Sequence, residues 1–109
     1  AEELIQYEQA IQRTAFLTKE MLSHSRTITE YPNWNSNERS FIGYSWFVSE
    51  TEDGSKMISH TGTQGGFYCD YVSIPSKGII YVMLCNILVQ QEPKREKVLA
   101  VLQKFNWLD

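Results

Sequence analysis

Apolar residues recur at helical spacing in the first part of the chain. This period predicts a helix from Glu3 to about Phe16 with one apolar face. The recurring residues are Leu4, Tyr7, Ile11 and Ala15. Thr18 then fits an N-cap position, and Leu17 and Leu22 are spaced to form a hydrophobic staple. We therefore expect a second, shorter helix that ends near Ser25.

A polar stretch separates these helices from a predicted sheet. Residues 27–41 are rich in turn-forming residues, which indicates a loop. Beyond it come four segments that alternate in hydrophobicity or are rich in Ile, Val and Tyr, as is typical of strands. They cover residues 42–48, 56–60, 67–74 and 79–86. Because short turns join neighbouring segments, we predict a four-stranded antiparallel sheet within residues 42–89.

An apolar stripe returns near the end of the chain. Pro93 suits the first turn of a helix over residues 92–106, and the stripe of this helix must cover a sheet face. Its members are Val98, Val101, Leu102 and Phe105. The sequence thus predicts an α+β fold, with helices in residues 1–26, an antiparallel sheet and a covering C-terminal helix. At 109 residues, the chain makes a single domain or a fragment of one.

Composition narrows the classes of function. Apolar residues make up 42% of the chain, which is enough for a core. The net charge is −3, and no basic cluster exceeds Lys94-Arg95, so we expect no nucleic-acid partner. The apolar run 78–89 is too short to span a bilayer. No positively charged segment precedes an apolar stretch at the start, so we expect no signal peptide in these residues.

The two cysteines are expected to be free thiols. If residues 75–78 close a hairpin with Pro75 opposite Gly78, Cys69 falls opposite Leu84 and Cys85 opposite Tyr68. The two sulfurs then point to opposite faces of the sheet and cannot form a disulfide. Neither cysteine has a His or a second Cys at ligand spacing, so we expect no metal site.

One glycine-rich stretch, Ser59 to Phe67, concentrates the chemistry of the chain. It holds three of the six glycines, beside the titratable ring of His60 and the hydroxyl of Thr61. Glycines at positive φ let backbone N–H groups turn toward an anion or a developing oxyanion. The alternative is a hairpin link in which the glycines only make the bend and His60 is a surface residue.

The order of motifs resembles the C-terminal portion of the serine β-lactamase and penicillin-binding-protein family, in its class C, DD-peptidase and esterase-like branch. The quoted matches run through most of the chain. They are Thr18-Lys19-Glu20-Met21-Leu22, Gly43-Tyr44-Ser45-Trp46, His60-Thr61-Gly62, Gly66-Phe67, Pro75-Ser76-Lys77-Gly78 and the apolar strand Ile79 to Asn86. His-Thr-Gly alone is a weak signal, and the ordered set is much stronger.

The resemblance implies one wall of an acyl-transfer site that acts on a β-lactam, a D-Ala-D-Ala peptide or an ester. His60 would lie beside the substrate carboxylate or the proton-transfer network, and the Thr61 hydroxyl would bind substrate. Gly62 would let the substrate lie against the strand, and the backbone N–H of Thr63 would be one of two oxyanion donors. The resemblance implies no cofactor, and it suggests a periplasmic or other extracytoplasmic location.

Two departures from the family pattern limit this interpretation. No serine of the chain begins a Ser-x-x-Lys motif, so the nucleophile is absent. Tyr31-Pro32-Asn33 spells the family's Tyr-x-Asn, but it lies too close to His60, and we interpret it as ordinary turn chemistry. The chain is therefore expected to be inactive alone and to need the helical part of its parent domain as a partner.

Two classes of function remain. In the first, the chain is the C-terminal fragment of a serine hydrolase. In the second, it is a non-catalytic binding or interaction module of the same fold. Because one covering helix of the family comes from the part missing here, the isolated chain is expected to leave a sheet face open, and this face could join two copies of the chain.

Overall fold

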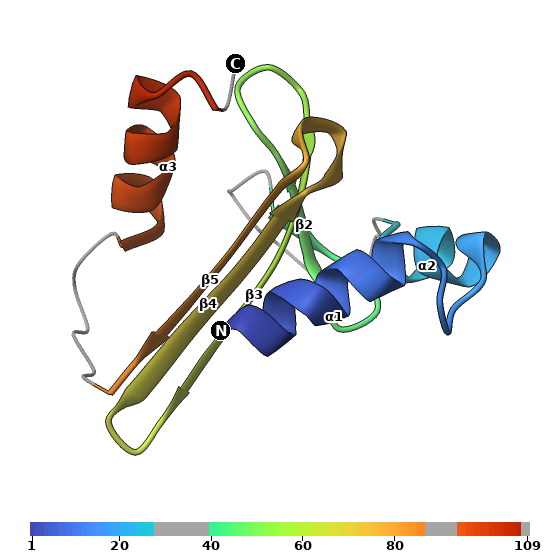
Figure 1. Ribbon diagram of the computed structural model, residues 1–109, viewed down its shortest axis with the longest axis horizontal. Coiled ribbons are helices and arrows are strands. Elements are labelled where there is room, and N and C mark those ends of the chain that lie inside the picture. Colours follow the sequence, from blue (N-terminus) through green and yellow to red (C-terminus); the bar gives the residue numbers. More distant parts are fainter. Residues whose placement is uncertain (28–39, 87–93, 108–109) are drawn as a thin grey trace.

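The computed structural model describes residues 1–27, 40–86 and 94–107 and shows an α+β fold (Figure 1). In these described residues, three helices and an antiparallel sheet confirm the predicted class. In chain order the elements are α1 (Glu2–Gln12), α2 (Lys19–Ser25), β1 (Ser40–Ile42), β2 (Phe47–Glu50), β3 (Lys56–Gln64), β4 (Phe67–Ile74), a 3₁₀ turn (Pro75–Lys77), β5 (Ile79–Cys85) and α3 (Lys94–Lys104). None of the helices in these described ranges is long and apolar enough to cross a membrane.

The first predicted strand is divided in two, so the described part of the chain forms a sheet of five strands, in the order β1-β2-β3-β4-β5. Gly43 N donates to Trp46 O at 2.8 Å, and Ser45 has a φ of 62°, so the chain reverses here and does not continue as one strand. The first of these strands, β1, begins at Ser40, so the sheet starts inside the predicted loop 27–41. Residues 28–39 of that loop lie outside the described residues.

The predicted link between the second and third strands is much shorter than expected. β3 continues to Gln64, and only Gly65 and Gly66 separate it from β4. Both glycines have positive φ, 55° and 92°, which a two-residue hairpin loop requires. The polar residues after Ser59 are strand residues, because polar side chains are compatible with a strand wherever its surface is exposed.

The register of β4 and β5 agrees with the prediction. Cys69 pairs with Leu84, and Tyr68 pairs with Cys85. Gly78 closes the turn in a left-handed conformation with a φ of 64°. Both cysteines are free thiols, as expected from their positions on opposite faces.

Helices lie on both faces of the sheet. Side chains alternate between faces along a strand, so Tyr71 and Ser73 of β4 share one face and Asp70 points to the other. Residues of α1 contact Tyr71 and Ser73, whereas Arg95 of α3 contacts Asp70. Among the residues whose side chains the structure describes, the buried apolar ones are Ile11, Val48, Ile58, Tyr71, Val72 and Ile74.

The first N-terminal helix differs from its prediction in length and in the face it buries, whereas α2 ends at Ser25 as expected. Thr18 caps α2 as expected, because its hydroxyl accepts from Met21 N at 3.2 Å. Helix α1 ends at Gln12, earlier than expected. Of its apolar stripe Ile11 is buried, but Leu4 is 39% and Tyr7 45% exposed. The other buried residue of α1 is Glu8, so a buried carboxylate holds this helix against the sheet, where it contacts Tyr71.

Candidate functional site

The residues singled out from the sequence all lie in β3, because the strand that was predicted to end at His60 continues through the expected link to Gln64. His60, Thr61 and Thr63 are exposed, and Gly62 is half-buried. On one side they pair with β4, where His60 faces Tyr71 and Thr61 faces Asp70. On the other side, the pairing of β3 with β2 ends at Ser59. Within the described residues, the last five residues of β3 therefore pair on one side only.

The hairpin determines which backbone groups point to the unpaired side. In a two-residue loop the flanking residues Gln64 and Phe67 exchange hydrogen bonds, so the backbone of Gln64 points to β4. Successive residues alternate, which directs Thr61 and Thr63 away from β4. The opposite end of β3 gives the same alternation. Thr51 N donates to Ser55 O at 2.9 Å across the β2–β3 hairpin, so Ser55, and with it every second residue up to Thr61 and Thr63, points away from β4. The N–H and C=O groups of Thr61 and Thr63 thus lie along a strand edge that no other described strand pairs with, called the free edge below.

His60 and Gly62 shape the surface beside this edge. The His60 ring lies 5.6 Å from the Phe47 ring, centroid to centroid, which gives the imidazole an aromatic neighbour. At Gly62, an added Cβ would lie 3.0 Å from the Sγ of Cys69. A side chain at this position would therefore displace the thiol, so glycine keeps the surface of the strand low.

A hollow of about 670 Å³ adjoins the same end of β3. The residues that form it include Gly62, Thr63, Phe67, Cys69, Leu84 and Asn86. Phe67 is 63% and Leu84 56% exposed, so apolar surface is open to solvent here. Phe67 and Cys69 alternate with Tyr68 and Asp70, and they share the face on which α1 contacts Tyr71. The hollow therefore combines apolar side chains with the free edge.

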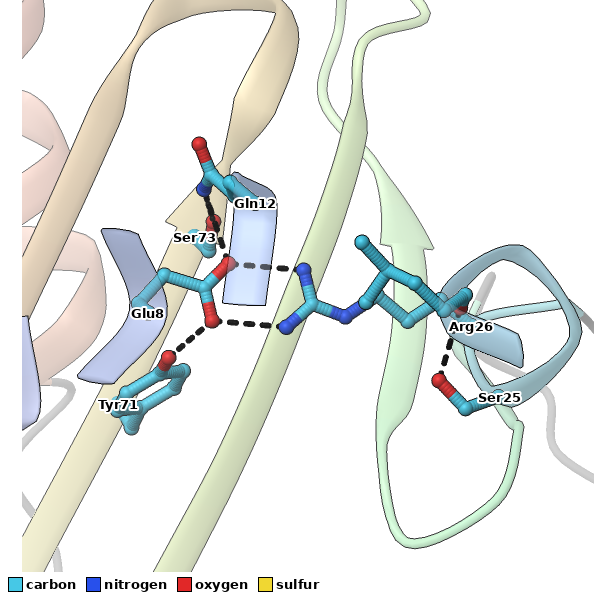
Figure 2. Close-up of polar contacts among 7 residues, drawn as sticks. Glu8, Gln12, Ser25, Arg26, Tyr71 and Ser73 are labelled. Carbon is cyan, nitrogen blue, oxygen red and sulfur yellow. Dashed lines mark hydrogen bonds and ion pairs between the residues drawn. The ribbon is translucent and has the colours of Figure 1, made fainter. Parts of the chain in front are cut away.

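A buried ionic cluster supports β4 from the α1 face (Figure 2). Both carboxylate oxygens of Glu8 accept from Arg26, at 2.8 and 2.7 Å, and Glu8 also accepts from Gln12 and from the Tyr71 hydroxyl. Burial alone would raise the pKa of Glu8. The hydrogen bonds from Arg26, Tyr71 and Gln12 outweigh burial and hold this pKa below its ordinary value. Burial and the bond to Glu8 raise the pKa of Tyr71.

A second cluster supports β4 from the α3 face. The fully buried Asp70 accepts from both Arg95 and the Tyr81 hydroxyl, and Arg95 also donates to Ser59 at 3.2 Å. Burial raises the pKa of Tyr81, as does its bond to Asp70. Tyr71 and Asp70 are the β4 partners of His60 and Thr61. Each cluster therefore fixes β4 directly across from a residue of the candidate site.

Neither cluster was predicted from the sequence. Glu8 and Arg26 are 18 residues apart, and Glu8 and Tyr71 are 63 apart, so no local pattern connects them. One signal was present in the sequence: Asp70 is the one charged residue of the strand Phe67–Ile74, which is a costly place for a charge without a partner. Tyr31-Pro32-Asn33 lies outside the described residues.

Comparisons of the chain with protein-family models, curated proteins and solved structures find no match. The function is therefore inferred from the site itself and from the motifs that it contains.

Proposed function

We propose that this chain is the C-terminal part of a β-lactamase-like serine hydrolase and supplies one wall of its acyl-transfer site. The free edge of β3 is the observation that carries the proposal. It presents the N–H groups of Thr61 and Thr63 on one side of the strand, next to the exposed His60. Outward N–H groups on a rigid strand are suited to hold the carbonyl oxygen of an acyl group as its negative charge develops.

Each residue has a distinct part in this proposal. The N–H of Thr63 donates to the oxyanion, and the Thr61 hydroxyl binds the substrate. His60 lies beside the substrate carboxylate or the proton-transfer network, and Gly62 lets the substrate approach the backbone. The substrate is a β-lactam, a D-Ala-D-Ala peptide or an ester. The nucleophile and its base come from a Ser-x-x-Lys outside these residues, because the chain contains none.

The open hollow supports the need for a partner. Its exposed apolar residues, Phe67 and Leu84, lie beside the free edge. In the proposal, the helical part of the parent domain covers this surface and brings the nucleophile to the edge. Without that part, the same surface is available to join two copies of the chain.

The first test is chemical labelling with a fluorescent penicillin. The 109-residue chain is expected to form no covalent adduct, whereas the polypeptide that also carries Ser-x-x-Lys is expected to form one. An adduct on a serine of the isolated chain would contradict the proposal. If the full polypeptide has no Ser-x-x-Lys and binds ligand without acylation, the chain is a binding module and not part of an enzyme.

A matched pair of variants tests the role of Thr63. In the full polypeptide, Thr63→Pro removes the backbone N–H, and Thr63→Val retains it. Proline is tolerated where the N–H faces a free edge, so both variants are expected to fold. Loss of one oxyanion donor is expected to lower kcat about 100- to 1,000-fold in Thr63→Pro only. Equal activity in the two variants would exclude the backbone role.

A further inference from the structure

A second hollow lies between the two N-terminal helices and the start of β3. Its volume is about 410 Å³, which is within the range of small-ligand sites. α1 contributes Gln12, and α2 contributes Lys19, Leu22 and Ser23; Lys56 and Ile58 come from β3. This hollow is separate from the free edge of β3, so its role does not depend on the proposed function.

The charges around this hollow have one sign. Every described ionisable residue that lines it is a cation, namely Lys19, Arg26 and Lys56. The charge of Arg26 is neutralised by Glu8 in a buried ion pair. The two lysines therefore leave a local excess of two positive charges, although the whole chain has a net charge of −3. Because the protein as a whole is acidic, these two cations would attract an anion to this hollow and not to the protein surface in general.

The lysine from β3 is already held in place. Lys56 Nζ donates to the backbone carbonyl of Arg26 at 2.9 Å. An ammonium group has three donors, so two of them remain for a ligand. Because this bond orders the side chain before binding, less conformational entropy is lost when an anion arrives.

The rest of the wall adds both polar and apolar groups. The hydroxyl of Ser23 is a further potential donor, and Leu22 and Ile58 supply nonpolar surface. Arg26 is only 4% exposed, and its Nε is a buried donor that has no acceptor among the described residues. In the part of the chain that the structure describes, no carboxylate lines the hollow to compensate this surplus of donors.

We propose that this hollow binds a small organic oxyanion, a phosphate or carboxylate group on a nonpolar body. The anionic group lies between the ammonium groups of Lys19 and Lys56, and the body lies against Leu22 and Ile58. The hollow is larger than one phosphate needs, which is why an organic body is part of the ligand.

The test is an NMR titration of the ¹⁵N-labelled chain with phenyl phosphate, inorganic phosphate and phenol. Phenyl phosphate is expected to shift the amides of Ser23 and Lys56 in a saturable way. Inorganic phosphate, which lacks the nonpolar body, is expected to bind more weakly. Phenol, which lacks the anion, is expected to bind more weakly still. Absence of saturable shifts with phenyl phosphate, or equal binding of phenol, would overturn the proposal.

Charge-neutralising variants connect any binding to the two lysines. Lys19→Gln and Lys56→Gln are each expected to weaken phenyl phosphate binding about fivefold, the upper range for an exposed ion pair. Lys104→Gln removes an exposed cation from α3, outside the hollow, and is expected to leave affinity unchanged. Lys19 lies on the exposed surface of α2, so its variant tests the charge without disturbing the fold. Unchanged affinity in Lys19→Gln, or an equal loss in Lys104→Gln, would overturn the proposal.

Discussion

Replacing Glu8 with glutamine is expected to destabilise the fold strongly, although glutamine has nearly the same shape. The side chain is 0% exposed, and its carboxylate is the acceptor for Arg26, Gln12 and Tyr71. Glu8→Gln removes the negative charge and leaves the Arg26 guanidinium buried without an ionic partner. Breaking a buried pair in this way costs about 3 to 5 kcal/mol. A domain of this size has about 5 to 15 kcal/mol of stability in total, so the loss is a large fraction.

Urea unfolding followed by tryptophan fluorescence measures this loss. Trp46 is a suitable reporter, because the Arg26 guanidinium carbon lies 5.1 Å from its ring centroid and the Tyr71 ring lies 5.4 Å away. Urea slopes for small domains are about 1 to 3 kcal/mol per M, so the midpoint is expected to fall by about 2 M. Glu3→Gln, which alters an exposed glutamate of the same helix, serves as the matched control.

A double-mutant cycle separates the interaction energy of the Glu8–Arg26 pair from the effects of changing each residue alone. Arg26→Met alone leaves Glu8 buried without its cation, and it is expected to cost about as much as Glu8→Gln. The two changes together are expected to cost much less than their sum, because no unpaired charge remains. The reasoning is refuted if Glu8→Gln changes stability by less than about 0.5 kcal/mol, the usual range for surface substitutions. Strict additivity in the cycle would refute it as well.

Two further predictions concern acid and the C-terminal helix. The pKa of Glu8 in the folded state is depressed, so the contribution of Glu8 to stability is fully present above the ordinary glutamate pKa of about 4.3 and is lost as pH falls through the folded value. Between pH 7 and pH 3, the free energy of unfolding should therefore fall less in Glu8→Gln than in the unaltered chain. Parallel curves of stability against pH would contradict this prediction. Asp70→Asn removes a fully buried carboxylate and leaves Arg95 without its ionic partner, which is expected to cost about 3 kcal/mol of stability. The change is also expected to speed hydrogen exchange in α3 more than in α1. Equal exchange in both helices would show that Arg95 does not hold α3 in place.

The sequence was informative where structure depends on neighbouring residues. The cap at Thr18 and the register set by the 75–78 turn both follow from a few adjacent side chains, and both are confirmed. Fold class followed from the same kind of pattern, because helical and strand periods are read over short windows. The sequence also placed His60 at the end of a strand and Thr61 in the link after it, whereas both residues lie within β3.

The misses share a physical cause. A hydrophobicity pattern selects apolar residues for the buried face of a helix, so the predicted face of α1 included Tyr7 and left out Glu8, whereas the structure exposes Tyr7 and buries Glu8. Glu8 is tolerated inside because Arg26 and Tyr71 come to it from distant parts of the chain. Likewise, β3 was predicted too short because Thr61 to Gln64 are polar, yet β4 supplies their pairing partners. Contacts between distant residues decided each of these cases.

The two hairpins that flank β3 also restrict how this protein can change length. Each hairpin fixes which residues of the strand hydrogen-bond outward, and the alternation has a period of two. Deleting or inserting a single residue between Lys56 and Gln64 would put the alternation set by the β2–β3 hairpin out of step with the alternation set by the β3–β4 hairpin. Gains or losses in this strand therefore keep the regular pairing of both hairpins only in even numbers. In this segment, relatives that share the function should differ by substitution far more often than by single-residue insertion or deletion.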